Sequence, residues 1–178
     1  AMSLEPEGAP SPVAFEQLVE EFGDRVYGIA LRITGSPPDA EDATQDAFLS
    51  AFRAWPRFRS EASPGTWLYR IAVNAALQRV RAARPVEYLI ETDEEQETVR
   101  DWRSDVPAAA ERSELYAALE VGIGLLPPDV RVAVVLRDVE GLSTAEAATA
   151  MELSEAAVKS RLHRGRVLLR QYLQDYLA

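Results

Sequence analysis

Residues 143–166 read STAEAATAMELSEAAVKSRLHRGR, and this stretch predicts two helices joined by a very short turn. Ser143 and Glu146 have the Ser-x-x-Glu spacing of a capping box, which opens a helix that we expect to end near Met151. Ser154 is placed to cap a second helix after only two or three intervening residues. This arrangement is that of a helix-turn-helix, whose second helix enters the major groove of DNA.

The second helix of this pair is basic. Its cations are Lys159, Arg161, Arg164, Arg166 and Arg170. We expect Val158 and Leu162 to point inward, and Ala148 to be the small residue where the two helices cross. The alternative is an ordinary helical hairpin with a basic face in solvent, but the charge and the short turn favour the helix-turn-helix.

The chain before this motif also has helical periodicity. Apolar residues recur at helical spacing from Leu115 to Leu126, and Pro127-Pro128 then interrupts them. Residues 130–136 alternate like a strand, but Pro128 at the start and Gly141 at the end fit a short helix, which is our prediction.

Three further helices are predicted in the first half of the chain. The first begins at residue 13 and stops at Gly35, and the second is capped by Ser36 and ends at Trp55. The third is capped by Ser63 and runs to about Arg84. The apolar stripe of the second helix consists of Ala40, Ala43, Ala47, Phe48, Ala51, Phe52 and Trp55. We therefore predict an all-α protein.

Two surfaces of these helices carry polar groups in patterns that permit two interpretations. Opposite the alanine stripe lie Glu41, Asp42, Gln45 and Asp46, which are either a solvated face or a docking face for a basic partner; spacing alone favours the solvated face. Phe58, Trp67 and Tyr69 lie among Arg57, Arg59, Arg70, Arg79, Arg81 and Arg84. Such rings either pack in the core or stack on the bases of single-stranded nucleic acid, and the sequence favours neither.

The charge distribution divides the chain. The formal net charge is −10, yet residues 57–84 carry +5 and residues 155–178 carry +3, with −8 over residues 85–120 between them. Because phosphate attraction is local, both basic segments can meet nucleic acid despite the net charge. We predict two small helical domains, 13–84 and 113–178, joined by a flexible acidic linker over 85–112 and preceded by a disordered lead-in over 1–12.

Composition argues against several classes of protein. The chain has no cysteine and one histidine, His163, which leaves little for a thiol nucleophile, a metal site or a catalytic triad. We expect no enzyme activity, no cofactor, no metal and no small-molecule substrate. Apolar runs are well short of the roughly 20 residues of a membrane span, so we expect a cytoplasmic protein without membrane insertion.

Taken together, the two halves resemble the extracytoplasmic-function (ECF) sigma factors of the sigma-70 family over about residues 14–174. The matching segments are AEDATQDAF at 40–48, Phe58-Arg59, TWLYRIAVNAA at 66–76, LPP at 126–128, LRDVEGLS at 136–143 and VKSRLHRGR at 158–166. The resemblance implies a protein that binds core RNA polymerase, directs it to a promoter and helps to open the duplex.

The resemblance also implies roles for individual residues. Asp42, Gln45 and Asp46 would dock on the clamp of the polymerase beta-prime subunit, which reverses the preference for a solvated face. Phe58, Arg59, Trp67, Arg70 and Asn74 would capture the minus-10 element, and Lys159, Ser160, His163 and Arg164 would contact the minus-35 element. The acidic linker would run through nucleic-acid channels of the polymerase, against its beta subunit.

Two parts of the chain depart from the residues that the family usually has. Glu152 stands where the family usually has glycine in the turn of the helix-turn-helix, so this turn is either strained or of a different geometry. Pro64-Gly65 and Ser60 also depart from the usual residues of the base-capture loop.

Regulation is expected to come from a separate protein, an anti-sigma factor. The alternatives are a stand-alone helix-turn-helix repressor and a polymerase adaptor that does not read DNA.

Overall fold

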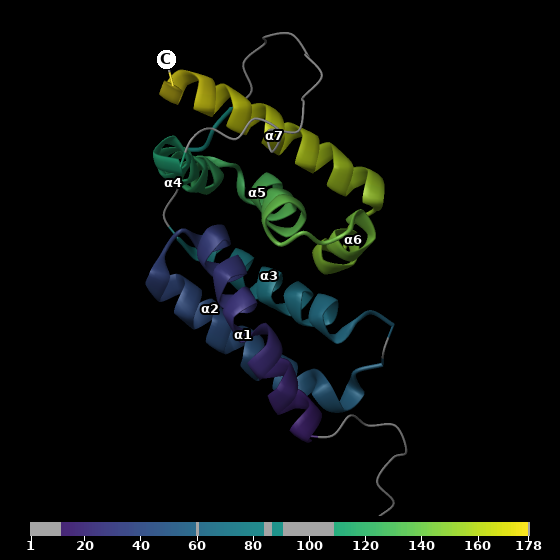
Figure 1. The fold of residues 1–178 in the computed structure, drawn as a ribbon. Coiled ribbons are helices and arrows are strands. Elements are labelled where there is room, and N and C mark those ends of the chain that lie inside the picture. The colour runs from purple at the N-terminus through teal and green to yellow at the C-terminus, as the bar shows by residue number, and fades with distance from the viewer. Residues whose placement is uncertain (1–11, 60, 84–86, 91–108, 178) are drawn as a thin grey trace, which may run out of the picture. The chain divides into compact units, whose positions relative to one another are not determined.

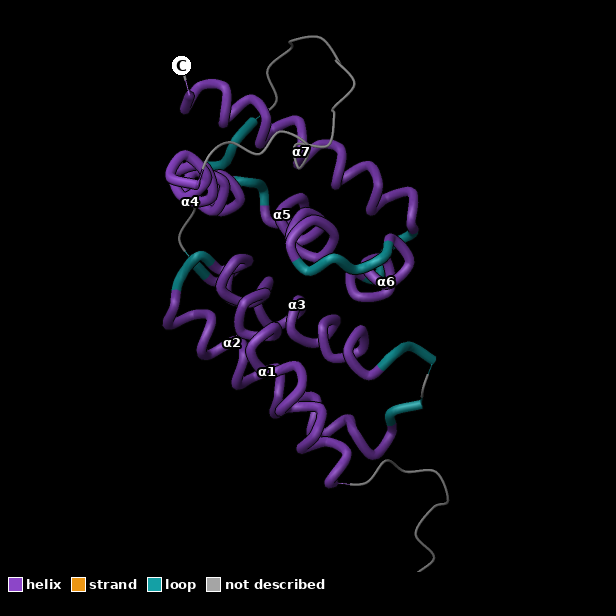
Figure 2. Tube along the Cα trace, in the orientation of Figure 1, coloured by secondary structure: helices purple, strands orange, loops and turns teal. Residues whose placement is uncertain are grey.

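The computed structural model describes residues 12–59, 61–83, 87–90 and 109–177 as helices and short connections (Figures 1 and 2). No strand occurs in these ranges, which confirms the predicted all-α class. The helices form two compact units, one before residue 83 and the other containing most of the chain that follows. The predicted lead-in lies outside the described residues except for Pro12.

The first unit is a bundle of three helices that all contact one another. Its elements are α1 (Pro12–Thr34), α2 (Pro37–Ala54), the 3-10 turn η1 (Trp55–Arg57) and α3 (Pro64–Ala82). α1 begins one residue earlier than predicted, because proline is well suited to a first helical turn. Gly35 ends it in the left-handed conformation at φ +68°.

Helix α2 packs through small side chains. The backbone N–H of Asp39 donates to the Ser36 Oγ at 3.4 Å, as the predicted cap requires, and Ala40, Ala43, Ala47 and Ala51 are fully buried. The expectation for Phe52 is wrong, because its side chain is 58% exposed. Phe52 follows Ala51 around the helix by about 100°, so it leaves the stripe and meets Phe15 edge-on at the rim of the core, with ring centroids 5.4 Å apart.

The second unit is also helical throughout its described residues. Its elements are α4 (Ala109–Leu125), α5 (Pro128–Val134), the π-helical turn η3 (Val135–Val139), α6 (Thr144–Met151) and α7 (Glu155–Leu177). α5 and η3 confirm the predicted helix over the strand alternative, and Val130, Val132 and Val134 are all buried within α5. At Gly165, a Cβ atom would lie 2.5 Å from the Val134 Cγ2, so this glycine permits the close approach of α7 to α5.

Parts of the predicted linker belong to this second unit. Residues 109–112 are the first turn of α4, and the backbone N–H of Leu89 donates to the Leu125 carbonyl at 2.9 Å. The Arg131 guanidinium lies 5.7 Å from the centre of the Tyr88 ring. The rest of the linker lies outside the described residues.

The predicted caps of the helix-turn-helix are present. The Ser143 N–H donates to the Glu146 Oε2 at 2.7 Å, and the Glu146 N–H donates to the Ser143 Oγ at 3.1 Å, which completes the capping box. Hydrogen bonds from Ser143, first from its backbone N–H, lower the pKa of Glu146. The Ala157 N–H donates to the Ser154 Oγ at 3.1 Å, and Val158 is fully buried as expected.

The turn between α6 and α7 has the geometry that glycine would favour, with glutamate in its place. Glu152 has φ +55°, and no other non-glycine residue of the described chain has a positive φ. The Leu153 N–H donates to the Ala148 carbonyl at 3.0 Å, and the Glu152 N–H donates to the Thr149 carbonyl at 3.3 Å. These two bonds form a Schellman motif with Glu152 at its left-handed position, so the turn is strained rather than different in geometry.

A buried ion pair connects η3 to α7. The Arg166 guanidinium donates to both carboxylate oxygens of Asp138, at 2.7 and 3.0 Å, and the Asp138 side chain is only 3% exposed. The π-helical turn contains a Glu140 N–H bond to the Val135 carbonyl at 2.9 Å. Arg166 is therefore used to neutralise a buried carboxylate inside the domain.

The strain at Glu152 can be measured. We expect Glu152→Gly to stabilise the second unit by about 0.5–1 kcal/mol, because glycine removes the Cβ penalty of the left-handed conformation but increases the entropy of the unfolded chain. Hydrogen exchange of α6 and α7 amides would measure the change. Glu152→Gln removes the charge but keeps the Cβ, so an equal gain in that variant would contradict the explanation by strain.

The Asp138–Arg166 pair makes a second stability prediction. Arg166→Ala is expected to destabilise the second unit by about 2–3 kcal/mol, because it removes the guanidinium from a buried carboxylate. Lys159→Ala, on the exposed side of the same helix, should stay within about 0.5 kcal/mol of the parent. Urea unfolding followed by helical circular dichroism would compare them, and equal effects would show that the ion pair is not structural.

Candidate nucleic-acid interfaces

Three aromatic rings gather where α2 ends and α3 begins. Phe58 stacks on Trp55 with a centroid distance of 5.3 Å and an angle of 11° between the rings. Trp67 meets Phe58 at 5.0 Å and Trp55 at 5.7 Å. Trp55 is buried, whereas Phe58 and Trp67 are partly exposed. The buried Trp55 side chain therefore supports the partly exposed rings of Phe58 and Trp67 from beneath.

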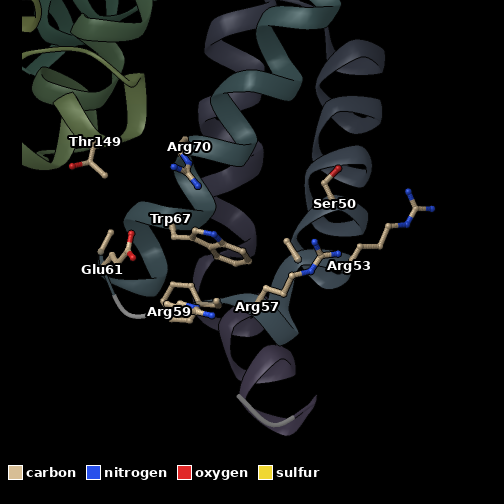
Figure 3. Close-up of a pocket in the computed structure, with 11 residues that line it drawn as sticks. Ser50, Arg53, Arg57, Arg59, Glu61, Trp67, Arg70 and Thr149 are labelled. Atoms are coloured by element: carbon tan, nitrogen blue, oxygen red, sulfur yellow. The ribbon is translucent and has the colours of Figure 1, made fainter. Parts of the chain in front are cut away.

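A cavity lies beside Phe58 and Trp67, two of these three rings (Figure 3). Its lining from the first unit comprises Ser50, Arg53, Ala54, Arg57, Phe58, Arg59, Glu61, Ala62, Trp67 and Arg70. In Figure 3 the side chains of Arg57, Arg59 and Arg70 lie around the Trp67 indole ring, whereas Arg53 extends away from it. Arginines that line a cavity together with partly exposed rings are chemically suited to phosphates and bases together.

The cavity brings together four of the five predicted minus-10 residues. Phe58, Arg59, Trp67 and Arg70 line it, but Asn74 does not. Asn74 is exposed and follows Trp67 by two helical turns, on the same face of α3 and about 10 Å further along it.

Two arginines of the cavity, Arg53 and Arg57, were not among the predicted site residues. Arg57 was noted only for its charge, and Arg53 belongs to the preceding helix. In the sequence the two arginines lie two residues before and two residues after Trp55. This spacing points to the site only when the structure shows that Trp55 supports Phe58 and Trp67.

Tyr69 belongs to the core instead of the cavity. Its side chain is 3% exposed and meets Phe22 edge-on, with centroids 5.8 Å apart. The Arg25 guanidinium lies 5.4 Å from the centre of its ring. Tyr69 therefore supports α3 from within, whereas Trp67 lies toward solvent.

The acidic face of α2 is paired with a cation from the same unit, Arg79. Asp42, Gln45 and Asp46 are exposed opposite the alanine stripe. Arg79 of α3 donates to the Asp46 Oδ2 at 2.5 Å and to the Asp42 Oδ2 at 3.4 Å. The hydrogen bond to Asp46, followed by attraction to the nearby acids, raises the pKa of Arg79. In the sequence Arg79 belongs to the basic segment 57–84, but in the structure it lies among the acids of α2.

The predicted minus-35 residues share one side of α7. Lys159, Ser160, His163 and Arg164 are all exposed, while Val158 and Leu162 are buried on the other side. Two of the remaining cations have acidic neighbours inside the domain. Arg161 lies 3.8 Å from Asp129, and Arg166 is bound to Asp138. α7 thus has an exposed polar side, where the predicted minus-35 residues lie, and separate arginines that pair with acids of its own domain.

Other kinds of site have no support in the described part of the chain. No group of three or more His, Cys, Asp or Glu side chains there could hold a metal ion. Among the same residues, no helix has the length and apolar character needed to cross a membrane.

Comparison with known proteins agrees with this division into two halves. Residues 18–86 match the family described as Sigma-70 region 2, and residues 116–169 match Sigma-70, region 4. The RNA polymerase sigma-H factor of Pseudomonas aeruginosa is 33% identical over 171 residues, which cover 92% of this chain and 88% of that protein.

Two further matches extend the comparison. The ECF RNA polymerase sigma factor SigE of Mycolicibacterium smegmatis is 37% identical over 93% of this chain, which spans only 62% of that longer relative. The structure of CnrH in complex with the cytosolic domain of CnrY has a TM-score of 0.67 and 28% identity, and the match covers 93% of this chain and 90% of CnrH.

These matches set aside the repressor and adaptor alternatives, since both regions occur in one chain and in the expected order. The chain belongs to the ECF sigma factors of the sigma-70 family, non-enzymatic proteins that act with RNA polymerase in transcription initiation.

Proposed function

We propose that this sigma factor opens promoters by capturing minus-10 bases in the cavity between α2 and α3. The observation that carries the proposal is the pair of partly exposed rings, Phe58 and Trp67, held on buried Trp55 beside four arginines. Extruding a base costs a few kcal/mol, and stacking on an aromatic ring returns about 1–3 kcal/mol per base. Arg59 and Arg70 would hold the phosphates of the non-template strand.

Asn74 completes this proposed site as a base-reading group. Its amide can both donate and accept a hydrogen bond, and its position on the Trp67 face of α3 directs it along the path of the same strand. Residues 13–84 would thus form the polymerase-binding and melting domain.

The α7 face would read the minus-35 element in the major groove. Arg164 and Lys159 can bridge the acceptor edge of guanine, while Ser160 and His163 can make adaptable polar contacts. Residues 113–178 would form this second domain. The acidic segment that precedes α4, within the predicted linker over 85–112, would follow polymerase channels and reach its beta subunit.

Docking on core polymerase is proposed for the acidic face of α2. Asp42, Gln45 and Asp46 are exposed together, and carboxylates with an amide fit a basic surface on the beta-prime clamp. A separate regulatory protein is also proposed. Its support is the resemblance to CnrH, which was solved in complex with the cytosolic domain of CnrY.

Base capture is tested with Asn74→Ala. We expect this variant to form open complexes about tenfold more slowly on duplex templates, because it loses one contact to an unpaired base. Templates with a pre-melted minus-10 bubble should restore part of the activity, since the cost of unpairing is already met. Gln78→Ala, an exposed amide one turn further along α3, is the matched control. Equal activity of Asn74→Ala on both templates would remove Asn74 from the site.

Minus-35 reading is tested with Arg164→Ala in transcription from promoter libraries. The variant should lose discrimination at one minus-35 position by about 1–3 kcal/mol, whereas loss of a phosphate contact would weaken all sequences alike. Arg170→Ala makes the same charge change beyond the proposed reading face and should keep the parent preference. The isolated protein should bind duplex promoter weakly. An unchanged preference in Arg164→Ala, or tight specific binding without polymerase, would contradict the assignment.

A further inference from the structure

The acids of the proposed docking face are bridged by a single guanidinium. Arg79 contacts one oxygen of each carboxylate, the Oδ2 of Asp42 and the Oδ2 of Asp46, across 33 to 37 residues of sequence. Asp42 and Asp46 are one turn apart on α2, where two like charges repel each other. Arg79 relieves this repulsion and reduces the local charge of the pair from −2 to −1.

This ion-pair cluster is accessible to a partner. The side chains of Asp42, Asp46 and Arg79 are 57%, 51% and 35% exposed. Exposed ion pairs contribute little to stability, because water competes for both charges. Breaking the contacts of Arg79 therefore costs little free energy. A second cation can then take the position between the two carboxylates.

We propose that Arg79 is a resident counter-ion of the docking face, which the basic surface of core polymerase displaces from Asp42 and Asp46 on binding. The inference rests on the proposed docking role of these acids and adds a competitor from within the chain. While Arg79 occupies the pair, it lowers the attraction for a basic partner and satisfies one oxygen of each acid. Affinity for polymerase is accordingly set below the value that the bare acids would give.

The test measures the affinity of the full chain for core polymerase at low and high salt. Arg79→Gln should bind about two- to fivefold more tightly at low salt, the range expected when one exposed charge pair is removed. The gain should shrink at high salt, because exposed charges are then screened. Arg81→Gln makes the same charge change on an exposed part of α3 without contacting the acids, so its effect should be clearly smaller.

Two further variants separate this proposal from the docking assignment. Asp46→Asn should weaken binding, and adding Arg79→Gln to it should give a smaller gain than in the parent. If Asp46→Asn weakens binding but Arg79→Gln weakens it or leaves it unchanged, displacement is wrong and docking stands. If neither single variant changes the affinity, both assignments are wrong.

A second variant of Arg79 is needed in case Arg79→Gln does not fold. Circular dichroism and thermal unfolding would establish that Arg79→Gln keeps the fold. Should it unfold, Arg79→Met decides, because methionine keeps a long unbranched side chain but has no charge to pair with the carboxylates. Tighter binding by Arg79→Met at low salt supports displacement, and equal or weaker binding overturns it.

Discussion

The close packing of α2 through four alanines determines where the functional groups of the first unit lie. Ala40, Ala43, Ala47 and Ala51 have no bulk beyond Cβ and are fully buried, so α2 lies directly against α1 and α3. This contact turns the acids of α2 outward. It also delivers Trp55 to the core at the end of the helix, where it supports Phe58 and Trp67. A bulky residue in the stripe would separate the helices and disturb both surfaces at once.

The charge of the protein becomes consistent with DNA binding once its arginines are sorted by their partners. Arg79 and Arg166 are paired with carboxylates of their own unit, so neither presents a full charge to DNA. The exposed cations are instead concentrated beside the aromatic cavity and on one side of α7. A net charge of −10 opposes the approach of the whole protein to DNA, while the aromatic cavity and the exposed side of α7 stay locally basic.

Local signals made most of the fold predictable from the sequence. Ser143 with Glu146, and Ser154, specify helix starts through hydrogen bonds between residues three apart, so no tertiary information is needed. The same cannot hold for Tyr69 and Trp67, which are two residues apart in one helix but have opposite environments. Periodicity shows that they point in different directions, and only the packing of α1 shows which direction is inward.

Side-chain partners distant in sequence account for what could not be predicted of the sites. In the sequence Arg79 is one of several cations in the basic segment 57–84. Its pairing with Asp46 depends on how α2 and α3 pack, which the sequence pattern does not give. Arg57 joins the candidate site at the end of η1, and Arg53 joins it from the last turn of α2.

The turn at Glu152 shows a different relation between sequence and structure. Glycine would relieve the left-handed strain there, yet both hydrogen bonds of the Schellman motif form with glutamate in place. The surrounding contacts must therefore outweigh a local penalty of about 1 kcal/mol. Buried Val158 and the capping bonds of Ser143 and Ser154 anchor the helices on both sides. The geometry of this helix-turn-helix is thus imposed by its helices, and the turn residue adapts to it.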